Sequence, residues 1–91
     1  MTNVHEEISA HSKKQHAIVS KFLVLEERRE ALIEQAIQQC KQSQPFSVSG
    51  INAVTAEINE LAKQGIIPTR KIVSDEMVQE FVDRKYKANN Q

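Results

Sequence analysis

Apolar residues in the first half of the chain recur at alternating steps of four and three, the spacing of one face of a helix. No Gly or Pro occurs over residues 3–42, which are rich in Glu, Gln, Lys, Arg and Ala, residues that favour helices. From Ile18 onward the stripe widens, because further apolar side chains lie beside it. The pattern predicts one long helix over residues 3–42, started by a capping box of Asn3 and Glu6. The alternative is a bend between His11 and Ser20 that makes two ordinary helices.

Two shorter helices are predicted after a loop at residues 43–49, which is rich in Ser and contains Pro. The first covers residues 50–64 and ends at Gly65, which suits the left-handed position after a helix. Ser47 or Ser49 is its expected N-cap. Its predicted inward face consists of Ile51, Val54, Ile58, Leu61 and Ala62.

The last helix is predicted over residues 74–87, with Ser74 as the N-cap and acidic residues in the first turn. Residues 66–73 are either extended or a short turn, and residues 88–91 are expected to fray. The predicted inward face of this helix consists of Met77, Val78, Phe81 and Val82.

These elements predict a single all-α domain over residues 1–91, in which the two shorter helices fold back along the long one. A helix of about 40 residues is on the order of 60 Å long and offers more apolar surface than the shorter helices can cover. We therefore expect a second copy to complete the bundle, giving a homodimer built on coiled-coil-like packing. The residues expected at that interface, or in the core beside it, are Ile18, Phe22, Leu25, Leu32 and Ile33.

The composition excludes several classes of function. Twelve basic and twelve acidic side chains cancel, so no overall positive field attracts nucleic acid or an anionic membrane. Two glycines are too few for the loops that hold phosphates or dinucleotides. No apolar run approaches the roughly 20 residues of a membrane-spanning helix. The polar N-terminus and a single cysteine favour the reducing cytoplasm.

The histidines near the N-terminus do not form a recognisable metal site. His5 begins an H-E-x-x-H pattern, but Ser9 stands where the second histidine ligand is required. Glu7 and His11 offer two ligands at four-residue spacing, and a third would have to come from elsewhere. We therefore expect no metal and no cofactor.

Neither the acidic row nor the cysteine predicts catalysis. Glu26, Glu30 and Glu34 follow one another at four-residue spacing, which is most often a solvated helix face. Cys40 lies near a helix C-terminus, where the dipole disfavours a thiolate, so a packed free thiol is expected. The protein is not expected to be an enzyme.

The alternative function is nucleic-acid binding by a helix-turn-helix-like segment over residues 51–82. Arg70, Lys71, Arg84 and Lys85 would then form one basic edge. Because residues 50–91 contain six basic and six acidic side chains, this reading is the weaker one.

The stretches LEERRE at residues 25–30 and GIIPTRK at residues 65–71, together with the length and layout, carry a family resemblance. The chain resembles a small family of proteins of unknown function from Bacillus and related Firmicutes. The resemblance implies a stand-alone cytosolic bacterial protein and supplies no site residues. The functional hypothesis is a non-catalytic interaction or regulatory protein that acts as a homo-oligomer, with any protein partner unidentified.

Overall fold

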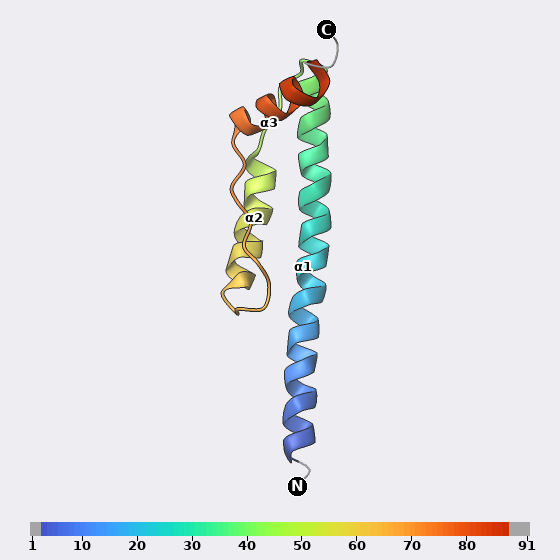
Figure 1. Cartoon of the computed structure of the whole chain (residues 1–91), viewed down its shortest axis with the longest axis vertical. Helices are drawn as coiled ribbons and strands as arrows, with labels where there is room; N and C mark the ends of the chain where they lie inside the picture. Colours follow the sequence, from blue (N-terminus) through green and yellow to red (C-terminus); the bar gives the residue numbers. More distant parts are fainter. Residues whose placement is uncertain (1–2, 88–91) are drawn as a thin grey trace.

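The computed structural model describes the backbone of residues 3–87 and the side chains of residues 12–86. The first helix, α1 (Asn3–Lys41), runs without interruption, so the alternative of a bend before Ser20 is wrong (Figure 1). The expected capping by Asn3 and Glu6 lies outside the described side chains. The molecule is elongated, measuring 69 × 24 × 16 Å, and its long axis follows α1.

The end of α1 is a Schellman motif formed without glycine. Ser43 adopts a positive φ of 60°, the left-handed conformation that Gly usually supplies. The N–H of Ser43 donates to the carbonyl of Cys40 at 3.0 Å, and that of Gln44 to the carbonyl of Gln39 at 2.8 Å. These two bonds satisfy carbonyls that the end of a helix leaves without partners, and they turn the chain back toward α1.

The second helix, α2 (Ser49–Ala62), runs antiparallel to α1, and the two form a helical hairpin (Figure 1). Its N-cap is Val48, which makes no side-chain capping bond, so the expectation of Ser47 or Ser49 at that position is wrong. Ser47 still provides a partner for a backbone group at the start of α2, because its Oγ accepts the N–H of Ser49 at 3.2 Å. The predicted ending is confirmed: Gly65 has a φ of 80° and donates its N–H to the carbonyl of Ala62 at 2.9 Å.

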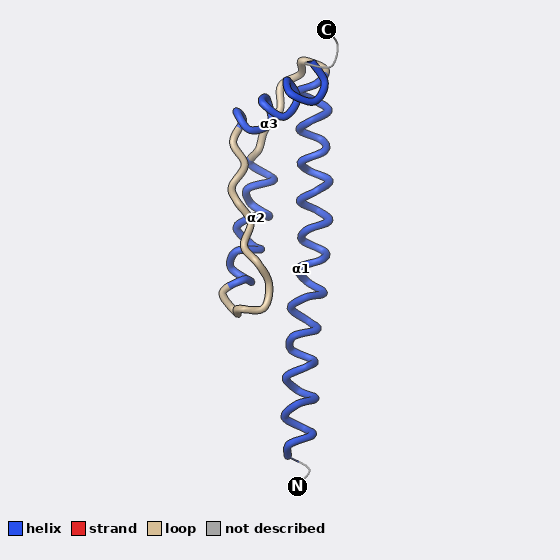
Figure 2. Tube along the Cα trace, in the orientation of Figure 1, coloured by secondary structure: helices blue, strands red, loops and turns tan. Residues whose placement is uncertain are grey.

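Residues 63–74, here called the return segment, run back along α2 without regular structure (Figure 2). They lead to α3 (Asp75–Val82), which lies across the end of the hairpin and continues into one π-helical turn, η1 (Asp83–Lys87). The predicted cap of α3 is confirmed, since Ser74 Oγ accepts the N–H of Met77 at 3.2 Å. The described residues form helices and no strand, which confirms the all-α prediction.

The core consists of two apolar clusters along the hairpin. The cluster near the hairpin bend joins the end of α1 to α3 and is formed by Ala36, Ile37, Cys40, Ile51, Val73, Val78 and Val82. The cluster near the middle of α1 joins it to α2 and the return segment and is formed by Ile18, Leu25, Val54, Ile58 and Ile67. Leu32 packs against both clusters and so connects them.

The inward faces predicted for the shorter helices are only partly right. On α2, Ile51, Val54 and Ile58 are buried, while Leu61 and Ala62 are half-buried. On α3, Val78 and Val82 are buried, but Met77 and Phe81 are 46% and 39% exposed. Because α3 crosses the end of the hairpin and meets it along a narrow face, two of its four apolar positions are left at the surface.

Candidate protein-interaction surface

A group of polar contacts is built around Arg29 of α1. Arg29 Nε donates to Thr55 Oγ1 at 2.9 Å, and Arg29 Nη2 donates to the carbonyl of Lys71 at 2.9 Å. Thr55 is fully buried, and its hydroxyl also donates to the carbonyl of Ile51 at 2.8 Å. One guanidinium therefore ties α1 to both α2 and the return segment. Arg29 occupies the one charged position in the apolar stripe from Ile18 to Ala36.

Two asparagines of α2 hold the return segment in place. Asn59 pairs its amide with the backbone of Arg70, accepting the N–H at 2.8 Å and donating to the carbonyl at 3.0 Å. Asn52 pairs in the same way with Val73, at 2.8 and 2.9 Å. The seven residue-to-residue steps of helix from Asn52 to Asn59 rise about 10 Å, and the three steps of extended chain from Arg70 to Val73 span about the same distance. The matched spacing lets one helix face bind the extended backbone at two points.

The side chain of Arg70 fixes the return segment to α1 as well. Its Nε and Nη2 donate to the two carboxylate oxygens of Glu26 at 3.0 and 2.7 Å, a bidentate pair. These hydrogen bonds hold the pKa of the Glu26 carboxyl below its ordinary value, with the positive charges of Arg70 and Arg29 adding to the effect. The guanidinium also lies 5.4 Å from the centre of the Phe22 ring. Glu26 thus has a structural partner, whereas the sequence analysis placed it on a solvated face.

With α1 held in this way, part of its apolar surface faces solvent. Val19 and Leu23 lie four residues apart on one face of α1, here called the outer face, and are 39% and 59% exposed. Val24, on a neighbouring face, is also 59% exposed. Figure 1 shows α1 continuing past the far end of α2, with no other part of the described chain beside it. The hairpin therefore covers one side of α1 and leaves another open.

An apolar groove of about 380 Å³ lies between α1 and α3. Its walls come from α1, α3 and the residue before the cap of α3, and they comprise Glu30, Ile33, Glu34, Ile37, Val73, Met77, Val78 and Phe81. Met77 and Phe81, which the sequence analysis placed in the core, supply its exposed apolar surface. Glu30 and Glu34 are exposed and make its charged edge. The groove is thus an apolar surface with an acidic rim.

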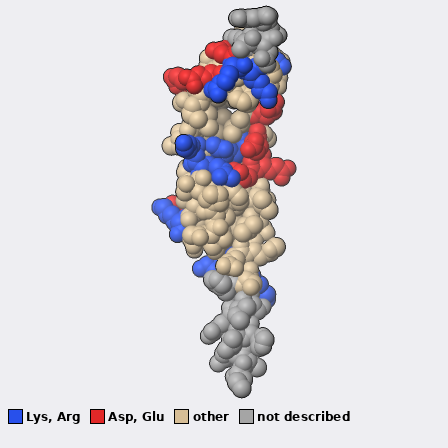
Figure 3. Space-filling view, in the orientation of Figure 1, with Lys and Arg blue, Asp and Glu red and all other residues tan. Residues whose placement is uncertain are grey.

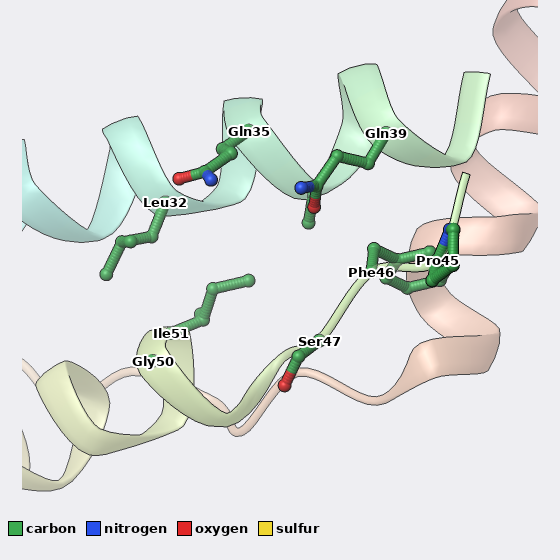
Figure 4. A pocket seen from close by; sticks show the side chains of 9 residues that line it. Leu32, Gln35, Gln39, Pro45, Phe46, Ser47, Gly50 and Ile51 are labelled. Atoms are coloured by element: carbon green, nitrogen blue, oxygen red, sulfur yellow. The ribbon is translucent and has the colours of Figure 1, made fainter. Parts of the chain in front are cut away.

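A second hollow, of about 430 Å³, lies between α1, the loop after it and the start of α2. In Figure 4, Leu32 and Gln39 extend from α1 toward Ile51 of α2, and Pro45 and Phe46 close one end. The residues that line it carry amides, one hydroxyl and apolar groups, and none is charged. This hollow therefore offers shape and hydrogen bonds, and its one hydroxyl, that of Ser47, has no charged residue beside it in the lining.

The five residues predicted for an interface lie mostly in the core of this single chain. Ile18 and Leu25 are buried, and Phe22, Leu32 and Ile33 are half-buried against the two clusters. They therefore belong to the core of the single chain. In the described part of α1, the exposed large apolar residues are Val19, Leu23 and Val24. The sequence pattern placed Val19 and Leu23 beside the main stripe without distinguishing which side of the helix would be covered.

The basic residues of the nucleic-acid alternative do not form a helix-turn-helix. Twelve residues separate α2 from α3, and the return segment carries the chain back along α2, whereas that motif needs a turn of about 3–4 residues. Arg70 is paired with Glu26. Arg84 and Lys85 belong to η1, which α3 separates from Lys71 along the chain. Figure 3 shows basic side chains in separate groups on one face, with acidic side chains beside them.

A reactive cysteine and a metal site receive little support from the residues that the structure describes. Cys40 is a buried free thiol whose Sγ donates to Gln79 Oε1 at 3.4 Å, as expected of a packed cysteine. Among the described residues, no group of three or more His, Cys, Asp or Glu is arranged to hold a metal ion. His5, Glu7 and His11 lie outside the described side chains. None of the helices described here is long and apolar enough to cross a membrane.

The fold and this surface define an elongated all-α protein in which a long helix carries an exposed apolar face. The chain belongs to the family described as "Protein of unknown function (DUF2533)", which matches residues 2–84. It is 49% identical over 84 residues to the uncharacterized protein YpbS of Bacillus subtilis (strain 168). The aligned region covers 92% of this chain and 99% of that protein. No solved structure matches the chain. These comparisons confirm the family resemblance.

Proposed function

We propose that this protein is a non-catalytic interaction or regulatory protein that acts as a homodimer through the outer face of α1. The observation that carries the proposal is the exposure of Val19 and Leu23 on a helix whose adjacent face, at Ile18 and Leu25, is already packed in the core. Burying a leucine removes it from water with a gain of about 1.5–3 kcal/mol, so a second copy is a favourable cover for this face. A single cysteine kept as a packed thiol suits a reducing compartment, and the proposed site of action is the cytoplasm.

The exposed surface area of the chain is large enough for an interface with a second copy. The chain exposes 6717 Å². A compact monomer of 10.3 kDa exposes about 5,400 Å² by the usual scaling with mass. The difference exceeds the roughly 800 Å² that each partner buries in a standard protein interface. A dimer along α1 therefore has enough surface to form without any change in the fold.

Light scattering after size-exclusion chromatography tests the proposal. The chain is expected to run as a dimer at micromolar concentration, and Leu23→Glu is expected to make it monomeric because the charge would be buried at the interface. Ile72→Glu is the matched control, since Ile72 is 68% exposed and belongs to the return segment instead of α1. That variant should stay dimeric.

Circular dichroism of both variants separates loss of the dimer from loss of the fold. Equal helix content in Leu23→Glu and the parent chain, with only the former monomeric, supports the proposal. A monomeric parent chain at micromolar concentration, or equal dissociation by the two variants, would refute it.

A further inference from the structure

The outer face belongs to a longer seam on α1. Alternating steps of four and three residues connect Ser12, His16, Val19, Leu23, Glu26 and Glu30, and then reach Ile33 and Ile37 in the apolar groove. This is the a and d spacing by which two helices pack along their length. Val19 and Leu23 are the adjacent apolar positions of the seam that are exposed, with polar positions on both sides, whereas Ile37 is buried and Ile33 half-buried in the core of the chain.

We propose, on the basis of the proposed function, that the second copy binds antiparallel, with Val19 of each copy packed on Leu23 of the other. In antiparallel helix pairs a positions face d positions. This register therefore puts both exposed apolar residues into two neighbouring, symmetry-related layers. Its two-fold axis passes near Lys21, close to the midpoint of α1, so the two helices overlap along almost their whole length.

The charge pattern of α1 favours this direction over the parallel one. Residues 12–25 contain three lysines and no acidic residue, whereas residues 26–34 contain four glutamates and two arginines. One of those arginines, Arg29, is already bonded to Thr55 and Lys71. A parallel pair would set Glu30 against its own copy, and likewise Glu26, whose carboxylate is already paired with Arg70; like charges facing each other are unfavourable. The antiparallel pair sets them opposite His16 and Ser12 instead.

The same register brings one pair of opposite charges together twice. Lys13 and Glu27 each follow a seam position by one residue, and both side chains are exposed. With Val19 on the partner's Leu23, Lys13 lies beside the partner's Glu27, and the two-fold axis repeats the pair. Flanking pairs of this kind select orientation and partner in paired helices.

Disulfide trapping tests the direction. Lys13→Cys and Glu27→Cys are made separately in a Cys40→Ala background, and the two proteins are mixed, allowed to exchange and oxidised. In the proposed dimer, Lys13→Cys links to Glu27→Cys. The two copies of residue 13 lie about 24 Å apart along the axis, far beyond the reach of a disulfide. The expected product is therefore the mixed dimer, with neither variant cross-linking to itself.

Exchanging the charges of Lys13 and Glu27 gives an independent test of the direction, measured as the dissociation constant of the dimer. Glu27→Lys should weaken the dimer about ten-fold, because both flanking pairs become repulsive, and adding Lys13→Glu should restore it to within about three-fold. Glu57→Lys, an exposed glutamate on α2, is the control and should leave the dissociation constant unchanged.

These outcomes distinguish failure of the antiparallel arrangement from failure of the dimer itself. A dimer by light scattering in which each cysteine variant links to itself overturns the antiparallel arrangement and leaves the dimer proposal standing. A dimer in which the added Lys13→Glu gives no recovery also overturns it. A chain that is monomeric throughout overturns both proposals.

Discussion

At the scale of single residues, side-chain amides and a guanidinium group bond the backbone of the return segment. They replace the backbone–backbone hydrogen bonds that a helix or strand would provide. Residues 68–74 belong to no helix or strand, yet a backbone that packs against helices must find partners for its N–H and C=O groups. Asn52, Asn59 and Arg29 provide them at Val73, Arg70 and Lys71. Truncating any of the three leaves backbone groups unpaired in a partly buried setting.

Asn59→Ala is expected to destabilise the protein by about 1–3 kcal/mol, because it leaves the N–H and the carbonyl of Arg70 without partners. Asn59→Asp should be at least as harmful, since it keeps the acceptor for the N–H but sets a carboxylate oxygen against that carbonyl. Urea denaturation measures both effects. Gln64→Ala, at an exposed position of the same segment, is the control. Equal stability of Asn59→Ala and this control would contradict the role given to Asn59.

The Glu26–Arg70 pair is expected to make stability depend on acid pH. The pKa of Glu26 is lowered in the folded state, so the unfolded chain takes up a proton first as the pH falls. The contribution of Glu26 is thus fully present above its ordinary value of 4.5 and is lost as the pH falls through the lower, folded pKa. Urea denaturation between pH 7 and pH 3 should show Glu26→Gln less stable at pH 7, with the difference shrinking in acid. A difference that stays constant with pH would argue against the pair.

At the scale of elements, the sequence predicts those parts of the fold whose signals are local. The continuity of α1 follows from the absence of Gly and Pro, and the start of α3 follows from Ser74. The left-handed turn at Ser43 was not predicted, because serine carries no preference for that conformation. Met77 and Phe81 were assigned inward because helical spacing defines a face but not the width of the surface that meets it.

The candidate surface was predictable only in part for a related reason. The width of the apolar stripe on α1 indicates that this helix contacts more than one neighbour. The spacing of the stripe does not say which part of it packs against α2. Ile18 and Leu25 turn inward because Val54 and Ile58 of α2 pack there. Val19 and Leu23, one step round the helix, remain outside. The contacts of Arg29 and of the two asparagines join residues distant in sequence and leave no periodic signal.

Ser43 and Gly65 adopt the left-handed backbone conformation after α1 and α2. Replacing Gly65 and introducing glycine at Ser43 should therefore have opposite effects on stability. Gly65→Ala should destabilise the protein by about 1 kcal/mol, because its φ of 80° is unfavourable for any residue with a Cβ. Ser43→Gly should stabilise it by a few tenths to about 1 kcal/mol, since it removes the same penalty at a φ of 60°. Thermal unfolding of both variants measures these changes. A destabilising Ser43→Gly would mean that the Ser43 side chain contributes more than its backbone conformation costs.

At the scale of the whole molecule, the shape is extended for a chain of this length. The radius of gyration is 18.5 Å, whereas a compact domain of 91 residues has about 12 Å. The excess comes from α1, whose length the rest of the described chain does not match (Figure 1). A short chain with a divided core gains only a small margin of stability from its own burial. Association along α1 would therefore contribute to folding as well as to binding.

This coupling predicts that the melting temperature depends on protein concentration. If the folded dimer unfolds to separate chains, mass action stabilises it as the concentration rises. The melting temperature of the parent chain should therefore increase by several degrees between about 5 and 500 μM, and that of Leu23→Glu should stay constant over the same range. Ile72→Glu should retain the dependence, because the outer face of α1 is intact in it. A parent chain that melts at one temperature across this range folds alone, and the uncovered face of α1 then contributes nothing to its stability.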